Sequence, residues 1–252
     1  MDVTAPTVDA DAFAELLRRV EADRHRDGWD QPARIYIVYG WEHPETDTVF
    51  RRLFSGRCGR PVRWRPYIAH PIAIPEAMAM PAVAVFLMAN NLRHHVAGTT
   101  RPGRENAAAA PAALLKQPGI VGIAMCMEVW CKKGASPGRG LPYSEERDAA
   151  LRDLYQGQKS LADVPGAVEN RVMTGVDITG QDCTWYRERG GKPTRDPLGL
   201  GDLLAGEPAP RADGAVIESL RMIADFIAGR PMVEPEFYPS RWDEFVDARR
   251  GA

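Results

Sequence analysis

Apolar residues recur at helical spacing near both ends of the chain, and each repeat is bounded by residues that start or stop a helix. The first segment, residues 8–28, begins with Asp9 or Asp11 as a cap and stops at Gly28. Its apolar positions are Phe13, Leu16, Leu17 and Val20. In the second segment, residues 213–230, the apolar positions are Val216, Leu220, Ile223 and Ile227. The spacing predicts an amphipathic helix in each.

Alternating apolar residues predict four strands, at residues 34–40, 119–131, 168–177 and 182–189. The last two strands are joined by Asp177–Ile178–Thr179–Gly180, which fits a short hairpin turn with glycine in a left-handed conformation. The second strand is apolar on both faces, as a central strand requires. We assign one face to Val121, Ile123, Met125, Met127 and Val129, and the other to Ile120, Gly122, Ala124, Cys126, Glu128 and Trp130.

The remaining segments give weaker patterns. They predict short helices at residues 44–54 and 143–158, one half-exposed edge strand at 60–75, a loop with at most one helical turn at 97–118, and a loop or lid at 190–211. Residues 77–92 are uncharged but shorter than the roughly 20 residues of a membrane span, so we expect a buried core helix and no membrane contact.

The order of these elements predicts an α+β fold, with a mixed or mainly antiparallel sheet, helices packed on one of its faces, and a C-terminal hairpin and helix. Residues 1–230 are predicted to form one domain and residues 231–252 an aromatic C-terminal arm. No glycine-rich turn follows a predicted strand in the manner of a dinucleotide or phosphate-binding loop, which argues against those enzyme classes.

Two of these segments are similar to parts of uncharacterised proteins from actinobacteria and their phages. They are "DGWDQPARIYIVYG" at residues 27–40 and "RVMTGVDITGQDCTWYRERGG" at residues 171–191. The resemblance supports the closing antiparallel hairpin and a bacterial or phage source, and it implies no activity. The preference for arginine over lysine, with abundant alanine, glycine and proline, is also typical of a GC-rich genome.

Composition narrows the classes of function further. The chain has 252 residues and a formal net charge of −2, so its overall charge does not indicate a nucleic-acid or acidic-membrane partner. Its N-terminus is acidic and has no apolar leader-like stretch, so we predict a cytoplasmic protein. The thiols are then expected to be reduced and free of metal, at Cys58, Cys126, Cys131 and Cys183.

The run "CMEVWC" at residues 126–131 is the chain's nearest approach to a chemical motif. In a regular strand Cys126 and Cys131 point to opposite faces and cannot share a zinc ion, so no metal or cofactor is predicted. Glu128 is a carboxylate in an otherwise apolar strand, and two interpretations are open. It forms an ion pair with Arg171 or Arg187, or it is an acid or base with a shifted pKa in a cleft, which would make the protein an enzyme.

Two further features suggest partners. A stretch of six arginines has no acidic residue among them and allows a nucleic-acid groove, although it is also typical of a protected sheet edge: Arg51, Arg52, Arg57, Arg60, Arg63 and Arg65. The proline-broken arm carries four aromatic side chains suited to anchoring a protein interface: Phe237, Tyr238, Trp242 and Phe245. A non-catalytic protein that associates with a partner or with itself through this arm is the favoured prediction. An enzyme or a nucleic-acid-binding protein is the alternative.

Overall fold

A seven-stranded antiparallel sheet organises the part of the chain that the computed structural model describes, which is residues 7–40, 61–72, 81–100, 105–132, 167–195 and 215–233. Its order is β2-β3-β1-β4-β5-β6-β7, and neighbouring strands are antiparallel throughout. The strands are β1 (Arg34–Gly40), β2 (Val62–Trp64), β3 (Tyr67–Ile72), β4 (Ile120–Lys132), β5 (Ala167–Asp177), β6 (Asp182–Glu188) and β7 (Thr194–Arg195). The α+β prediction is confirmed.

The four predicted strands are all present in this one sheet, as β1, β4, β5 and β6. The β5–β6 hairpin is also confirmed. Its turn is held by Asp177, whose Oδ1 accepts the backbone N–H groups of Thr179 at 2.7 Å and Gln181 at 3.1 Å. Gly180 has a positive φ of 89°, which is the conformation that favours glycine.

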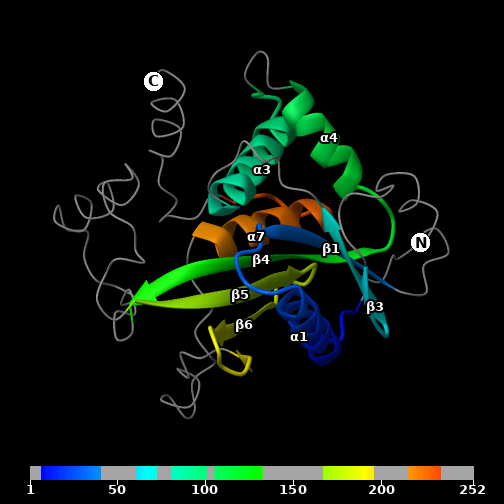
Figure 1. Ribbon diagram of the computed structural model, residues 1–252. Coiled ribbons are helices and arrows are strands. Elements are labelled where there is room, and N and C mark those ends of the chain that lie inside the picture. Colours follow the sequence, from blue (N-terminus) through cyan, green and yellow to red (C-terminus); the bar gives the residue numbers. More distant parts are fainter. Residues whose placement is uncertain are drawn as a thin grey trace, which may run out of the picture.

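Four helices pack against this sheet in the described residues: α1 (Ala10–Arg26), α3 (Pro81–Val96), α4 (Glu105–Leu115) and α7 (Ala215–Ile227). They cover both faces, so the prediction that helices cover one face is wrong (Figure 1). Helix α1 lies on one face, while α7 lies against β4 and β5 on the other, with α3 packed on α7 and α4 packed on α3. None of these helices is long and apolar enough to cross a membrane.

The two-sided burial follows from the central strands. In β1, Ile35, Ile37 and Tyr39 belong to the core under α3 and α7, while Tyr36 and Val38 belong to the core under α1. Both sets are buried and apolar, so each face needs its own helical cover.

Three segments differ in detail from the sequence-based prediction. Residues 60–75 were expected to form one edge strand, but β2 and β3 form a hairpin there, which turns at a cis peptide before Pro66. Strand β3 is internal, because it pairs with β1 on its other side. Pro71 is tolerated there since it lies beyond the end of the three-residue β2. Within the predicted loop 190–211, residues 194–195 add the short edge strand β7.

The predicted loop at residues 97–118 contains the helix α4 instead. Residues 107–110 are four alanines, and alanine has the highest helix propensity of any residue type. Ala112 and Leu115 are buried on one side of this helix. Pro111 lies inside α4, where it removes one backbone hydrogen bond. The alanine propensity and the buried side outweigh that loss. The predicted helices at 44–54 and 143–158 lie outside the described residues.

The register of β4 against β1 shifts by one residue between Val38 and Tyr39, which pair with Gly122 and Ile120. This bulge reverses the faces at the start of β4. Ile120 packs with the core under α3 and α7, and Val121 packs with the core under α1, the opposite of the assignment made from alternation. A one-residue register shift moves side chains to the other face, so the error is confined to these two positions.

Helix α1 approaches the sheet closely because two glycines lie beneath it on neighbouring strands. A Cβ on Gly122 would fall 2.7 Å from Cε2 of Phe13, and one on Gly175 would fall 2.9 Å from Cδ1 of Leu17. Neither position has room for a side chain at the observed spacing.

His70, on β3, is a buried histidine whose ring is nearly perpendicular to that of Tyr39, with the ring centroids 5.9 Å apart. Burial, with a smaller contribution from Arg63, lowers the pKa of His70 to about 3. The unfolded chain therefore binds a proton below pH 6.5 that the folded chain does not. Stability is full above about pH 6.5 and declines as the pH falls toward 3, by at most about 1.4 kcal/mol per pH unit from this group.

We therefore expect His70→Gln to flatten the pH dependence of stability. Between pH 7 and 5 the native protein should lose about 1–2 kcal/mol more of its unfolding free energy than His70→Gln, measured by urea unfolding at both pH values. His95→Gln, at an exposed position, is the control and should behave as the native protein does. If the native protein and His70→Gln lose the same unfolding free energy between pH 7 and 5, the lowered pKa of His70 is contradicted.

Candidate functional site

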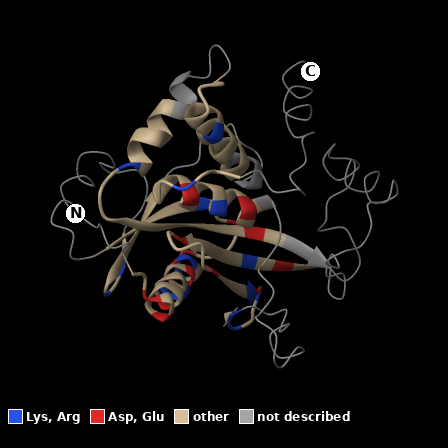
Figure 2. Ribbon diagram, turned by 180° about the vertical axis from the view of Figure 1, so that it is seen from behind, with Lys and Arg blue, Asp and Glu red and all other residues tan. Residues whose placement is uncertain are grey.

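Three charged residues lie side by side across the strands β4, β5 and β6. Glu128 pairs in register with Arg171, and Arg171 pairs in register with Arg187. Glu128 follows Cys126 by two positions and Arg171 precedes Met173 by two, so both share the face that packs on α1. Helix α1, which carries many acidic and basic residues, lies against this face of the sheet (Figure 2). We call Glu128, Arg171 and Arg187, together with Glu21 and Arg24 of α1, the charged cluster.

Glu128 uses both of its carboxylate oxygens within the protein. Oε1 accepts from Nε of Arg171 at 3.1 Å and from Nη2 at 2.6 Å. Oε2 accepts the backbone N–H groups of Asp30 at 2.7 Å and Gln31 at 3.2 Å. Arg171 also donates to the carbonyl oxygen of Gly28, in the same loop. The predicted ion pair with Arg171 is therefore confirmed, and it fastens the loop between α1 and β1 to the sheet.

Arg187 binds a different carboxylate, that of Glu21. Its Nε and Nη2 donate to Oε1 and Oε2 of Glu21, both at 2.7 Å, in a bidentate pair that is buried. Nη1 of Arg171 lies 4.0 Å from Oε1 of Glu21. Arg171 and Arg187 are direct cross-strand neighbours of like charge, an arrangement that is destabilising by itself. Glu21 supplies the negative charge that allows them to be adjacent.

Sequence analysis did not find Glu21 or Arg24. Both lie in the predicted helix at residues 8–28 but were not among its named positions, and both are buried. A signal was available: position 21 lies one turn after Leu17 and position 24 one turn after Val20, so both continue the apolar stripe of α1. Charged residues within such a stripe indicate buried partners on the facing element.

A second group of carboxylates lies where the cluster reaches solvent. Oxygens of Asp30, Glu128 and Glu169 all lie within 4.8 Å of one another. Arg189 contacts two of these residues, Glu169 Oε2 at 2.7 Å and Asp30 Oδ2 at 3.1 Å. Burial raises the pKa of Glu169, and Arg189 opposes this effect. Oxygen ligands suit magnesium or calcium, but Arg171 and Arg189 already supply the positive charge here, so we assign no metal to this group.

The indole of Trp29 covers the same two arginines from outside. The guanidinium carbon of Arg171 lies 4.6 Å from the ring centroid, and that of Arg189 lies 5.4 Å from it. Cation–π contacts of this kind add to the ion pairs and exclude water from them. The loop that carries Trp29 is thus held by its backbone, by its aromatic ring and by Asp30.

Cys126 is buried and forms no disulfide within the described residues. Burial raises its pKa to about 12, although Arg24 and Arg171 act in the opposite direction. The thiol is therefore protonated near neutral pH and is a poor nucleophile. Cys183 is also buried and forms no disulfide within the described residues. Cys58 lies outside the described residues.

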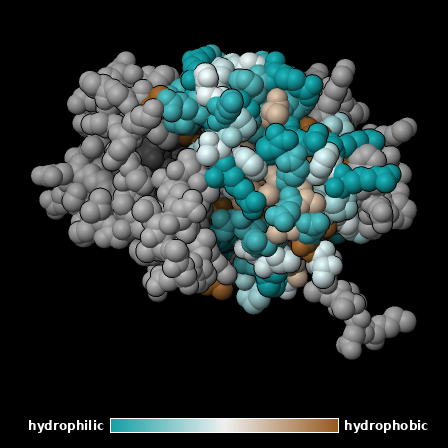
Figure 3. All heavy atoms as spheres, turned by 90° about the horizontal axis from the view of Figure 1, so that it is seen from below, coloured by the Kyte–Doolittle hydropathy of each residue, from teal (hydrophilic) through white to brown (hydrophobic). Residues whose placement is uncertain are grey.

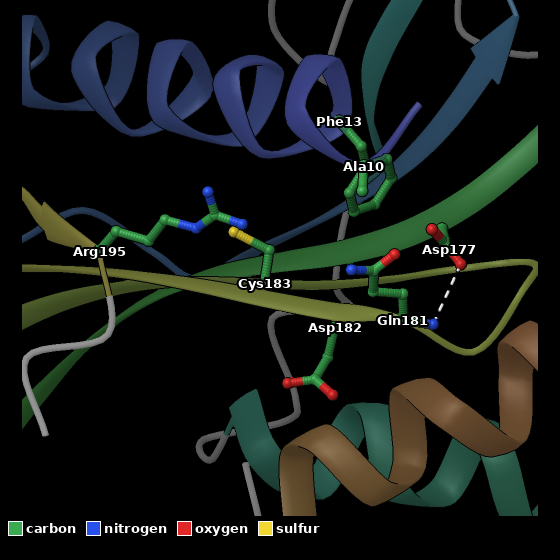
Figure 4. Close-up of a pocket in the computed structure, with 7 residues that line it drawn as sticks. All are labelled: Ala10, Phe13, Asp177, Gln181, Asp182, Cys183 and Arg195. Atoms are coloured by element: carbon green, nitrogen blue, oxygen red, sulfur yellow. Dashed lines mark hydrogen bonds between the residues drawn. The ribbon is translucent and has the colours of Figure 1, made fainter. Parts of the chain in front are cut away.

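A small pocket lies between the start of α1 and the β5–β6 turn (Figure 4). Its volume of about 10 Å³ is room for one water molecule at most. Asp182 points away from it toward α7, where its Oδ1 accepts from Arg221 at 2.7 Å. The residues around the pocket are Ala10, Phe13, Asp177, Gln181, Asp182, Cys183 and Arg195. A pocket of this size cannot hold an organic substrate.

The arginine-rich stretch is described only at its end. Arg63 and Arg65 are exposed in the β2–β3 hairpin. The guanidinium of Arg19, from α1, lies 3.5 Å from the ring centroid of Trp64, so that face of the indole is not open to a nucleic-acid base. Arg51, Arg52, Arg57 and Arg60 lie outside the described residues.

Comparison of the chain with models of protein families, with curated proteins and with solved structures gives no match. The fold and the charged cluster therefore have to be interpreted from their own geometry.

The predicted arm is described only where it leaves the core. Arg230 donates to the carbonyl oxygen of Ile178 and, through Nε, to Asp225 at 2.7 Å. Met232 packs on the core under α3 and α7, whereas Val233 is 72% exposed. The four aromatic residues predicted to bind a partner, Phe237, Tyr238, Trp242 and Phe245, lie outside the described residues.

Proposed function

We propose that this protein acts without catalysis, by associating with a protein partner or with a second copy of itself through the C-terminal arm. The observation that carries the proposal is the state of Glu128. Both of its oxygens are engaged, and its side chain is only 11% exposed, so it is poorly placed to exchange a proton with a substrate. The enzyme alternative depended on Glu128 as its acid or base, so this geometry counts against it.

The described surface also favours the arm over the body of the domain as the binding element. Seen from below, on the side of α1, the described surface is mainly hydrophilic, and its apolar atoms occur in small separate spots (Figure 3). Stable protein interfaces usually have a contiguous apolar centre. The arm offers four aromatic residues within a short segment, each with roughly 150–250 Å² to bury.

The proposal includes a cellular setting. It is an accessory role in a bacterial or phage system, for which the resemblance of residues 27–40 and 171–191 to actinobacterial and phage proteins supports the source alone. Neither Cys126 nor Cys183 forms a disulfide within the described residues, which is compatible with the predicted cytoplasmic location.

We expect replacement of the arm's central aromatic residues to abolish assembly without unfolding the domain. The test compares the native chain with Tyr238→Ser/Trp242→Ser by light scattering for molar mass and by thermal unfolding. Loss of one interface anchor costs about 2 kcal/mol or more, which is a factor of about 30, so the double variant should associate at least about thirtyfold more weakly. Val96→Ser removes an exposed apolar residue elsewhere and should leave assembly unchanged.

Two outcomes would refute the proposal. In the first, the native chain is a monomer at all concentrations, and affinity capture with it recovers no partner that the double variant loses. In the second, the double variant keeps its assembly state and instead melts at a lower temperature, which would make the arm a strap on its own domain.

A further inference from the structure

Three carboxylates and two arginines meet where the loop between α1 and β1 covers the end of the charged cluster. The carboxylates are those of Asp30 in the loop, Glu128 on β4 and Glu169 on β5, and their oxygens all lie within 4.8 Å of one another. The arginines are Arg171 and Arg189, each in contact with these carboxylates. Like charges at such short distances disfavour one another's ionised form, so this arrangement favours the uptake of one proton.

The charges on the neighbouring helix do not alter this balance. Glu21 is matched by Arg187, which binds both of its oxygens. Arg24 is matched by Asp27, whose Oδ2 lies 3.8 Å from Nη1 of the arginine. Each of these two pairs is neutral as a whole. The three carboxylates therefore face two arginines, and the excess is one negative charge.

Glu169 is the carboxylate of the three that accepts a proton most readily. Glu128 accepts hydrogen bonds from Arg171 and from two backbone N–H groups, which favour its ionised form. The side chain of Asp30 is 76% exposed, so water solvates its charge. The side chain of Glu169 is 6% exposed, and its partner Arg189 is half-exposed and shared with Asp30. Burial accordingly raises the pKa of Glu169, although Arg189 acts in the opposite direction.

Arg189 links Glu169 to the outer part of the loop. Its Nη1 lies 2.7 Å from Oε2 of Glu169, and its Nη2 lies 3.1 Å from Oδ2 of Asp30. Its guanidinium carbon lies 5.4 Å from the ring centroid of Trp29. Asp30 also has a positive φ of 64°, a conformation that is sterically unfavourable for residues other than glycine. The side chains of Trp29 and Asp30 are therefore held in part by an arginine that Glu169 holds in turn.

We propose that Glu169 and Arg189 form a proton-operated latch on Trp29. While Glu169 is ionised, it holds Arg189 against the indole and against Asp30. When Glu169 binds a proton, its ion pair with Arg189 becomes a weaker contact, and Asp30 is an exposed partner that holds the arginine weakly. Trp29 then keeps its contact with Arg171, at 4.6 Å, loses that with Arg189, and becomes more mobile. This latch is independent of the association through the arm.

The test follows the full chain by nuclear magnetic resonance as the pH is lowered from 8 to 4. The side-chain carboxyl ¹³C signal of Glu169, identified by its loss in Glu169→Gln, should titrate with a midpoint above the ordinary glutamate value of 4.5. The indole ¹⁵N–H signal of Trp29, identified by its loss in Trp29→Phe, should show faster motion in its heteronuclear NOE with the same midpoint. In Glu169→Gln, which resembles the protonated side chain, this faster motion should be present at every pH.

Two substitutions of exposed residues separate the latch from a general effect of acid. Arg189→Met removes the opposing cation and should raise the midpoint of Glu169, whereas Asp30→Asn removes a nearby negative charge and should lower it. Glu15→Gln, which removes a carboxylate paired on the surface of α1, should leave both signals unchanged. A Glu169 midpoint at or below 4.5, Trp29 motion that does not follow it, or a midpoint that Arg189→Met and Asp30→Asn fail to shift in opposite directions would each overturn the proposal.

Discussion

Replacing Glu21 with glutamine is expected to lower the free energy of unfolding by about 3–5 kcal/mol, the largest effect of any single substitution considered for this protein. The change removes the only carboxylate that binds Arg187 in the described residues, and it leaves Arg187 buried beside the like-charged Arg171. The glutamine is nearly the same size, so the loss is electrostatic rather than a loss of packing. Urea unfolding at neutral pH measures it.

Glu15→Gln is the matched control, because Glu15 lies on the same helix and pairs with Arg18 and Arg19 at the surface. Exposed ion pairs contribute at most about 1 kcal/mol, so this substitution should change the free energy of unfolding by no more than that. A double variant, Glu21→Met with Arg187→Met, removes both charges of the buried pair and should recover most of the stability. If Glu21→Gln is no worse than Glu15→Gln, the charged cluster is not what holds α1 to the hairpin.

Gly175→Ala is expected to destabilise the protein by about 1–3 kcal/mol through overpacking. The new Cβ would meet Cβ of Ala124 and Cδ1 of Leu17, both at 2.9 Å, and the backbone oxygen of Ile123 at 3.2 Å. The sheet cannot yield easily because Ala124 is the direct cross-strand partner of Gly175, so α1 has to move outward. Chemical unfolding and the melting temperature both report the change.

Gly40→Ala is the control for this substitution, since the nearest atom to its new Cβ is a backbone oxygen at 3.9 Å. It adds the same methyl group at the end of β1, without a clash. Combining Gly175→Ala with Ala124→Gly removes one of the two shortest contacts and should restore part of the lost stability. Equal stability of Gly175→Ala and Gly40→Ala would show that α1 is less tightly seated than the distances indicate.

Much of the sheet can be predicted from local pattern, because alternation and turn chemistry act over a few residues. The β5–β6 hairpin is an example: its strands alternate, and Asp177 and Gly180 specify the turn. The features that were predicted wrongly depend on distant partners. The helical cover on both faces, the bulge at Val121 and the pairing of β3 with β1 each require knowledge of what lies beside a strand.

The same distinction applies to the charged cluster. Glu128 was recognised because a carboxylate in an apolar strand is locally anomalous, and Arg171 was named as a partner from the neighbouring strands. Glu21 and Arg24 were missed because a charged residue on a surface helix is locally ordinary. Their burial is set by how α1 lies across the strands, which no short segment of the sequence contains.

The long pairing of β4 with β5 has a consequence for the tolerance of this protein to insertion and deletion. Lys132 and Ala167 are paired directly, so the two points that residues 133–166 connect are held side by side. The ends of that segment are held together by the ladder whatever its length, and the entropic cost of closing a loop grows only with the logarithm of its length. A change in the length of the connection between these two points therefore adds little to the entropic cost of closing it, and the register of β4 against β5 is set by the ladder itself.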